Sequence, residues 1–270
     1  MSGNMGQMSA KPDRGDHPDD PESVVSRDSE AGGIEGGIVE RALRRMSDRR
    51  DVVVWEGEPV DAGPALAYAH DAGSLRSERL RSLRTELLMR LGTHQGAAAF
   101  AILGCRPGEG RSQLCAELAL AFAQLGGKTL LVDANLRKPT LNKLFTGARS
   151  DLGLTEVLLG ETHTLPLHRV TGPNHLALLT AGTAPANPVD LLSGVQFERL
   201  VRDWSRTYDY VLIDTPPTSL RSDGIVIANA VRNVVIVARR HKTSYAEMNE
   251  LQRRLDATGA RTIGAVLNDF

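Results

Sequence analysis

Short, almost entirely apolar runs that alternate with helical segments constrain this chain more than any other feature. The runs lack the polar alternation of a strand with one solvated face, so they fit strands that are buried on both sides. Such strands, separated by helices, predict an α/β fold with a mostly parallel sheet covered by helices on both faces. The predicted strands are residues 97–103, 129–132, 176–179, 211–213, 234–238 and 263–267.

Helical segments are predicted from apolar spacing and from end signals. From Ser74, a plausible cap, leucines recur at helical spacing through Leu88. Another helix opens at Asn187 and Pro188, where Asn can cap and Pro suits the first helical position. Further helices are expected over residues 112–125 and 245–255.

The N-terminal part of the chain differs from the rest in composition. Residues 1–36 carry eight acidic against three basic side chains and are rich in Gly, Ser and Pro, which predicts disorder. A short amphipathic helix over residues 38–46 is either loosely packed or a docking segment. Residues 47–72 return to a linker-like composition. We therefore expect a disordered and linker extension over residues 1–72 and one folded domain over residues 73–270.

Composition excludes several classes of protein. A net charge of -1 and an aromatic content of 4% argue against a nucleic-acid platform. Two cysteines without metal-ligand spacing predict neither a disulfide framework nor a zinc site. No run reaches the roughly 18 apolar residues of a membrane span, and no signal-peptide core is present. A cytoplasmic protein, held at a membrane only by a partner, is expected.

A glycine-rich turn joins the first predicted strand to the next helix. Gly108 and Gly110 allow the backbone N–H groups of this turn to point inward, and the helix N-terminus adds a positive end. Ser112 supplies a hydroxyl where Mg²⁺ would lie beside the phosphates. This arrangement predicts a phosphate-binding loop; a plain strand-to-helix connection is the alternative.

The turn departs twice from the pattern G-x-x-x-x-G-K-[ST]. Cys105 replaces the first glycine, and Arg111 replaces the lysine. Arginine keeps the positive charge but presents a wider planar fork. Phosphate binding should survive both changes.

Two later strands end in an aspartate. Asp133 follows the strand at residues 129–132, and Asp214 follows the strand at residues 211–213. In parallel α/β sheets, ligands bind at the carboxyl ends of the strands, where a carboxylate can hold Mg²⁺ or accept a proton. One such Asp alone would more often be a turn or cap, but two of them downstream of a phosphate loop predict a nucleotide site.

These motifs together resemble the cytoplasmic domain of bacterial tyrosine kinases, the family that controls polysaccharide chain length. The resemblance runs from about Glu78 to Phe270 and is carried by PGEGRS, LLVDANLRKP, AGTAPANPVDLL, YDYVLIDTPP and GAVLND. The loop GEGRS and the ending VLNDF resemble the exopolysaccharide EpsG-type kinases more closely. The resemblance implies a P-loop NTPase fold, ATP and Mg²⁺ as cofactors, and tyrosine phosphorylation as the reaction.

Family roles carry over position by position. Arg111 takes the place of the Walker A lysine, Ser112 binds Mg²⁺, and Asp133 is metal partner and base. Asn135 stands where the family has a second Asp, and Asp214 is the Walker B carboxylate. The residues expected to bind the nucleotide are Pro107, Gly108, Glu109, Gly110, Arg111, Ser112, Gln113 and Asn268, the last at a position that contacts adenine in relatives.

Glu78, Arg81 and Arg84 match the E-x-x-R-x-x-R pattern through which such kinases assemble. At helical spacing they share one face, which is either an assembly surface or a solvated salt-bridged face. The resemblance thus implies a homo-oligomer and, as a partner, the cytoplasmic tail of a membrane chain-length determinant (polysaccharide co-polymerase).

Phosphorylation on a C-terminal tyrosine cluster is not predicted, because the chain ends without one. Tyr68, in the expected linker, is the favoured acceptor, and Tyr210 is expected to be structural. Two alternatives to an active kinase stay open. Arg111 and Asn135 favour a nucleotide-binding pseudokinase, and the fold also suits a positioning ATPase of the ParA/MinD kind.

Overall fold

The computed structural model describes residues 58–66, 68, 71, 73–91, 98–162, 164–172 and 175–269. The predictions of disorder over residues 1–36 and of a helix over residues 38–46 lie outside these residues.

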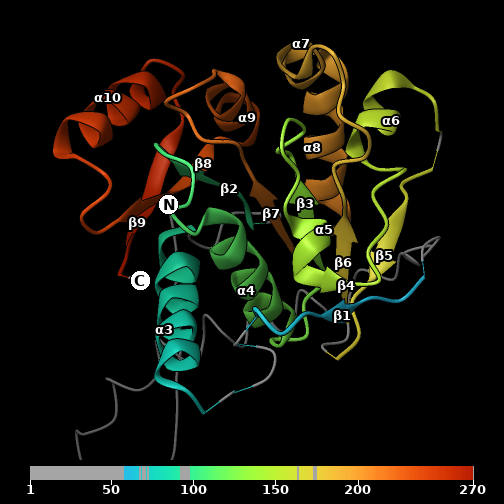
Figure 1. Cartoon of the computed structure of the whole chain (residues 1–270), viewed down its shortest axis with the longest axis horizontal. Coiled ribbons are helices and arrows are strands. Elements are labelled where there is room, and N and C mark those ends of the chain that lie inside the picture. The colour runs from blue at the N-terminus through green and yellow to red at the C-terminus, as the bar shows by residue number, and fades with distance from the viewer. Residues whose placement is uncertain are drawn as a thin grey trace, which may run out of the picture.

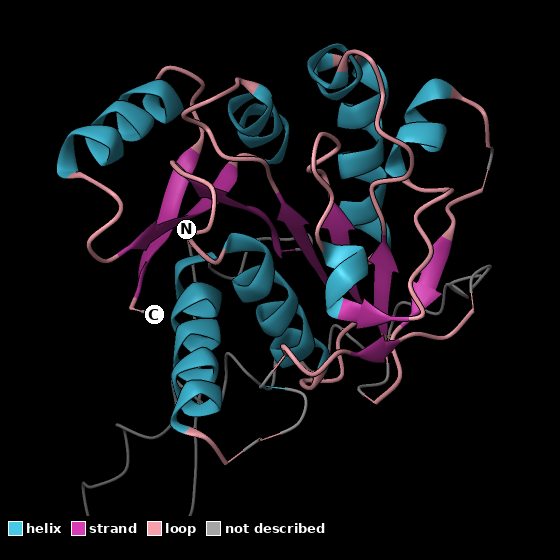
Figure 2. Ribbon diagram, viewed as in Figure 1, coloured by secondary structure: helices cyan, strands magenta, loops and turns pink. Residues whose placement is uncertain are grey.

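The centre of the protein is a seven-stranded sheet (Figures 1 and 2). Its strands, in spatial order, are β5 (Leu167–Arg169), β6 (Leu176–Leu179), β3 (Thr129–Asp133), β7 (Tyr210–Asp214), β2 (Ala98–Gly104), β8 (Asn233–Arg239) and β9 (Arg261–Asn268). All neighbours are parallel except β5, which is antiparallel to β6. The predicted α/β fold with a mostly parallel sheet is confirmed.

Helices cover both faces of the sheet (Figure 1). One face carries α3 (Leu75–Leu91), α4 (Arg111–Ala123) and α5 (Leu141–Leu144). The other carries α6 (Leu154–Leu159), α7 (Pro188–Ser193), α8 (Val195–Thr207), α9 (Asp223–Val231) and α10 (Tyr245–Asp256). Each face of the sheet thus has its own apolar core.

Strand β2 shows why the apolar runs are continuous. Phe100 and Ile102 point into the core beneath α4, while Ala101 and Leu103 point into the core beneath the other layer. A strand with helices on both faces needs apolar side chains at every position. The same demand acts on α4, whose residues are buried from Leu114 to Ala123.

Residues 58–66 pack on the domain, so the expected linker ends earlier than residue 72. Within this segment β1 (Asp61–Ala62) pairs antiparallel with β4 (Phe145–Thr146). Val60 and Leu66 are buried, and the Gly63 N–H donates to the Leu144 carbonyl at 2.8 Å. The alanine- and glycine-rich composition of this segment resembles a linker, so its few buried apolar residues were not predicted.

Tyr68, just after this segment, is also buried. Its side chain is 1% exposed, and its hydroxyl donates to Gln124 Oε1 at 2.7 Å. The expectation that Tyr68 lies in a flexible segment is therefore wrong, and its burial removes the basis for favouring it as an acceptor. Tyr210, by contrast, is buried in β7 as predicted.

The four predicted helices, α3, α4, α7 and α10, begin within one residue of the positions that the sequence signals indicate. Ser74 precedes α3, and its hydroxyl accepts the Ser77 N–H at 3.2 Å. Asn187 precedes α7 as predicted, although its side chain makes no capping hydrogen bond. Helices α8 and α9 and the antiparallel strand β5 were not predicted. Among the described residues, no helix is long and apolar enough to cross a membrane.

Candidate functional site

The turn between β2 and α4 has the backbone that a phosphate loop needs. Gly108 and Gly110 have φ values of 74° and 85°, in the left-handed region that glycine adopts readily. Gly110 is also the residue before the first turn of α4, whose N–H groups therefore open toward the loop. The backbone and helix dipole together favour an anion at residues 107–112.

Cys105 occupies the first glycine position without backbone strain. It is not among the residues with positive φ, so glycine is not required there. Its side chain is buried, and burial raises the pKa of the thiol to about 11. Cys105 is therefore a packing residue of the loop.

Arg111 lies back along the loop, almost fully buried. Its Nη1 donates to the Arg106 carbonyl at 2.7 Å and to Glu109 Oε2 at 3.2 Å, and its Nε donates to the Thr215 carbonyl at 3.3 Å. Glu109 is also fully buried and accepts a hydrogen bond from Thr243 Oγ1 at 2.6 Å. Arg111 also lines the cavity described below, so the residue belongs both to the loop and to the site.

The two strand-end aspartates lie side by side. Asp133 and Asp214 are register partners at the ends of the neighbouring parallel strands β3 and β7. Ser112 Oγ, at the start of α4, donates to Asp214 Oδ2 at 2.5 Å. The predicted meeting of loop hydroxyl and strand-end carboxylate is present.

Backbone N–H groups hold the Asp133 carboxylate. Its Oδ2 accepts from Thr140 and Leu141, both at 3.0 Å, and its Oδ1 accepts from Asn135 at 3.1 Å. Burial raises the pKa of this carboxyl to about 6, and the three hydrogen bonds oppose that rise. A carboxylate with a pKa near neutrality is suited to accept a proton.

Asp214 is less well satisfied. Its Oδ1 is buried and has no hydrogen-bond partner among the described residues. Burial first, and the nearby Asp133 carboxylate second, raise the pKa of Asp214 to about 7. A buried, unpartnered carboxylate oxygen beside a second carboxylate is an environment that a cation would stabilise.

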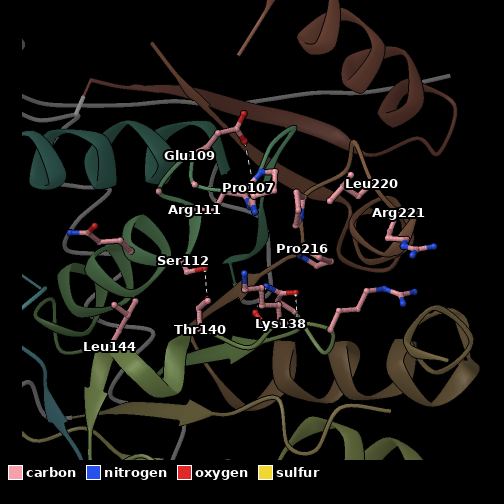
Figure 3. Close-up of a pocket in the computed structure, with 16 residues that line it drawn as sticks. Pro107, Glu109, Arg111, Ser112, Lys138, Thr140, Leu144, Pro216, Leu220 and Arg221 are labelled. Atoms are coloured by element: carbon pink, nitrogen blue, oxygen red, sulfur yellow. Dashed lines mark hydrogen bonds and ion pairs between the residues drawn. The ribbon is translucent and has the colours of Figure 1, made fainter. Parts of the chain in front are cut away.

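A cavity of about 540 Å³ opens beside Ser112, whereas the fully buried Asp133 and Asp214 are not among its lining residues (Figure 3). It is lined by every predicted loop residue, namely Pro107, Gly108, Glu109, Gly110, Arg111, Ser112 and Gln113. It also has lining residues that the sequence did not point out: Arg137, Lys138, Thr140, Leu144, Pro216, Pro217, Leu220 and Arg221. Arg137 and Lys138 belong to the quoted LRKP motif, whereas nothing local indicates Thr140, whose Oγ1 donates to Ser112 Oγ at 2.7 Å.

Asn135 closes the turn after β3. Its Nδ2 donates to the Lys138 carbonyl at 2.7 Å, and its Oδ1 accepts the Lys138 N–H at 3.3 Å. An aspartate could accept but not donate here. The Asn135 amide therefore closes this turn with two hydrogen bonds, of which an Asp at the same position could form only one.

Asn268 does not line the cavity. Its Nδ2 donates to the Glu109 carbonyl at 2.7 Å, so it supports the loop from the end of β9.

The predicted assembly residues divide into two groups. Glu78 and Arg81 form an ion pair at 2.5 Å on the exposed side of α3. Arg84 instead packs on α4 and donates from Nη1 to the Ala121 carbonyl at 2.7 Å. Burial lowers the pKa of Arg84, and its hydrogen bond to Ala121 directs one guanidinium nitrogen into the protein.

Curated relatives are tyrosine kinases. Tyrosine-protein kinase YwqD of Bacillus subtilis is 34% identical over 195 residues, which are 72% of this chain and 81% of that protein. Putative tyrosine-protein kinase CapB of Staphylococcus aureus is 31% identical over 202 residues, 74% of this chain and 88% of that protein. No protein-family model matches the chain.

Solved structures have the same fold. The kinase domain of the Escherichia coli tyrosine kinase ETK superposes with a TM-score of 0.71 at 26% identity, covering 84% of this chain and 85% of that one. The chimerical protein CapA2B2 gives 0.68 at 28% identity, covering 85% and 97%. The Pyrococcus furiosus cell division ATPase MinD gives 0.55 at 21% identity, covering 64% and 72%, a likeness of fold alone. The predicted P-loop NTPase fold is thus confirmed.

Proposed function

Because the chain belongs to the bacterial tyrosine kinase family, we propose that it is an ATP- and Mg²⁺-dependent protein-tyrosine kinase acting in exopolysaccharide production. The observation that carries this proposal is the pairing of Asp133 with Asp214 beside the hydroxyl of Ser112. The three groups combine metal-binding oxygens, a proton acceptor and the start of a phosphate loop.

The loop is suited to ATP. Residues 107–113 would receive the phosphates on their backbone N–H groups at the N-terminus of α4. Ser112 and Asp214 would hold Mg²⁺, because Asp214 Oδ1 has no partner among the described residues and Mg²⁺ prefers oxygen ligands. When bound, the metal neutralises charge on the phosphates. The described residues contain no group of three or more His, Cys, Asp or Glu that could hold a metal alone, which fits an ion shared with the nucleotide.

Asp133 is our candidate for the base. Its Oδ1 accepts one backbone hydrogen bond and Oδ2 accepts two, so Oδ1 is the freer atom to take the proton of a tyrosine hydroxyl. Arg111 would add positive charge beside the transferred phosphoryl group, in the manner that phosphoryl transfer requires.

A pseudokinase is the second candidate. Arg111 is already bonded to Glu109 and to two carbonyls, and Asn135 uses its side chain to close a turn. Both arrangements favour binding over turnover. The positioning-ATPase alternative has only the shared fold in its support.

We further propose the cellular setting. The family resemblance suggests an EpsG-type kinase recruited to the inner face of the membrane by the cytoplasmic tail of a chain-length determinant. Homo-oligomers would form through the exposed Glu78 and the half-buried Arg81 on α3, with Arg84 in a supporting position.

The test is tyrosine phosphorylation by purified protein mixed with the partner tail, Mg²⁺ and γ-labelled ATP. We expect phosphotyrosine with the native chain and a loss of about 100-fold or more with Asp133→Ala, because a positioned base contributes at least that factor. Asp151→Ala, at an exposed carboxylate paired with Arg149, is the matched control and should behave as the native chain.

The outcomes separate the candidates. Bound ATP with no phosphotyrosine above the Asp133→Ala level would make the protein a pseudokinase. Phosphate release without phosphotyrosine would instead support a positioning ATPase.

A further inference from the structure

The cavity has an exposed basic rim. We use this name for Arg137, Lys138 and Arg221, three exposed cationic residues that line the cavity (Figure 3). Arg137 and Lys138 follow β3, and Arg221 follows β7, so the rim comes from the two loops that leave the Asp133 and Asp214 strands.

The charge of the cavity lining is one-sided. Within the part of the chain that the structure describes, its only acidic lining residue is Glu109, which is fully buried and bonded to Arg111 and Thr243. The exposed part of the lining carries Arg137, which pairs with Asp223, and the cations Lys138 and Arg221, which form no ion pair with a described residue. Such a field attracts anionic groups and repels cationic ones.

Two of the rim cations are available for a ligand. Arg137 is anchored to Asp223, with Nη2 3.1 Å from Oδ1 and Nε 3.2 Å from both carboxylate oxygens. The side chains of Lys138 and Arg221 form no hydrogen bond or ion pair with any other described residue. Figure 3 shows Arg221 pointing away from the loop.

Apolar residues lie beside the rim. Pro216, Pro217 and Leu220 line the same cavity, and the Leu220 side chain is exposed, with 65% of the residue accessible. An exposed apolar surface next to unpaired cations suits a ligand with an apolar ring and negative charges nearby. A tyrosine within an acidic segment has both features.

The nucleotide does not explain the rim. The loop at residues 107–112 and the N-terminus of α4 already offer an anion site of their own. The rim lies in the loops that follow β3 and β7, the strands that end at Asp133 and Asp214. Resting on the kinase function above, we propose that Lys138 and Arg221 select acceptor tyrosines flanked by acidic residues.

The test compares two peptides that differ only in the residues flanking one tyrosine, acidic in one and neutral in the other. We expect a higher kcat/KM for the acidic peptide, with an advantage that declines as salt is added. In the double variant Lys138→Glu/Arg221→Glu the ratio of the two kcat/KM values should fall about tenfold or more, as expected for reversing two exposed charges. Arg202→Glu, an exposed cation on α8 that does not line the cavity, should keep the native ratio.

Binding measurements keep this inference separate from the kinase proposal. Versions of both peptides with Phe in place of Tyr are titrated into the protein with ADP and Mg²⁺, so turnover is not needed. Tighter binding of the acidic peptide, lost in the double variant, supports the inference even if no phosphotyrosine forms. Equal binding of the two peptides overturns it, as does a double variant that loses ATP affinity while keeping the native peptide ratio.

Discussion

At the scale of single residues, the site places two buried carboxylates close enough to repel each other when both are ionised. Asp133 and Asp214 are both fully buried and adjacent in register. Ionising both without a cation is unfavourable, because burial and mutual repulsion disfavour the charged forms. The raised pKa values thus reflect an unfavourable free energy of ionisation, which a bound metal cation would reduce.

The burial and mutual repulsion of these carboxylates predict how the stability of the metal-free protein depends on pH. The pKa of Asp214 rises from 3.8 to about 7 on folding, so the folded chain binds this proton more tightly than the unfolded chain. Its contribution to stability is therefore present below pH about 4 and is lost as pH rises through about 7. In EDTA, Asp214→Asn should be more stable than the native chain at pH 8, by roughly 1–3 kcal/mol, and by a smaller margin at pH 5, where only part of the contribution is lost.

Urea unfolding at the two pH values measures this difference. Asp203→Asn, at an exposed carboxylate on α8, is the control and should show no stability gain that increases from pH 5 to pH 8. A native chain that is as stable at pH 8 as at pH 5, together with an Asp214→Asn variant that gains nothing at pH 8, would contradict the prediction.

At the scale of elements, the strand–loop–helix unit of β2 and α4 depends on its left-handed glycines. The same φ of 74° occurs at Gly108 in the loop and at Gly160 at the end of α6. A Cβ at Gly160 would meet nothing within 4 Å, and one at Gly108 would meet only the mobile end of Lys242, at 2.9 Å. An alanine should therefore have a similar unfavourable backbone energy at both positions, although only Gly108 lies in the phosphate loop.

Substituting each with alanine separates stability from binding. Both Gly108→Ala and Gly160→Ala should lower the free energy of unfolding by about 1 kcal/mol, the cost of left-handed backbone for a residue with a Cβ. Only Gly108→Ala should also weaken ATP binding, because its relaxation turns loop N–H groups away from the phosphates. Calorimetric titration of Mg-ATP checks this, and equal affinities of the two variants would count against the loop as the phosphate site.

At the scale of the whole molecule, the folded unit begins before the main sheet. Residues 58–66 and Tyr68 run from the β1–β4 pair to α4, and Gln113 Nε2 donates to the Ala65 carbonyl at 3.0 Å. This segment therefore contacts both ends of α4, including the N-terminal end that follows the phosphate loop.

Tyr68 tests that conclusion. Tyr68→Phe should cost about 1 kcal/mol for the lost hydrogen bond, and Tyr68→Ala about 3–5 kcal/mol for the emptied core position. Tyr245→Ala, at a tyrosine that is 81% exposed in α10, should change stability by less than about 0.5 kcal/mol. Denaturant unfolding gives all three values. A Tyr68→Ala variant as stable as Tyr245→Ala would contradict the conclusion that this segment is part of the folded domain.

Local patterns were enough for much of the molecule. The runs around β2, β3, β7 and β8 predicted a parallel sheet because residues buried on both faces must be apolar throughout. The rule that ligands bind at the carboxyl ends of parallel strands then brought Asp133 and Asp214 together. Helix α8 was within reach too, since Phe197, Val201 and Trp204 recur at helical spacing. Helix α9 was not, because a short apolar run does not distinguish a strand from a helix.

What the sequence by itself determined was the kind of fold and the residues of the phosphate loop, because both depend on neighbours along the chain. Only the tertiary structure decided the strand order, the burial of Tyr68, the turn-closing amide of Asn135 and the basic rim. Each of these depends on contacts between segments far apart in the sequence, and a residue's local composition does not say which distant surface will cover it or leave it exposed.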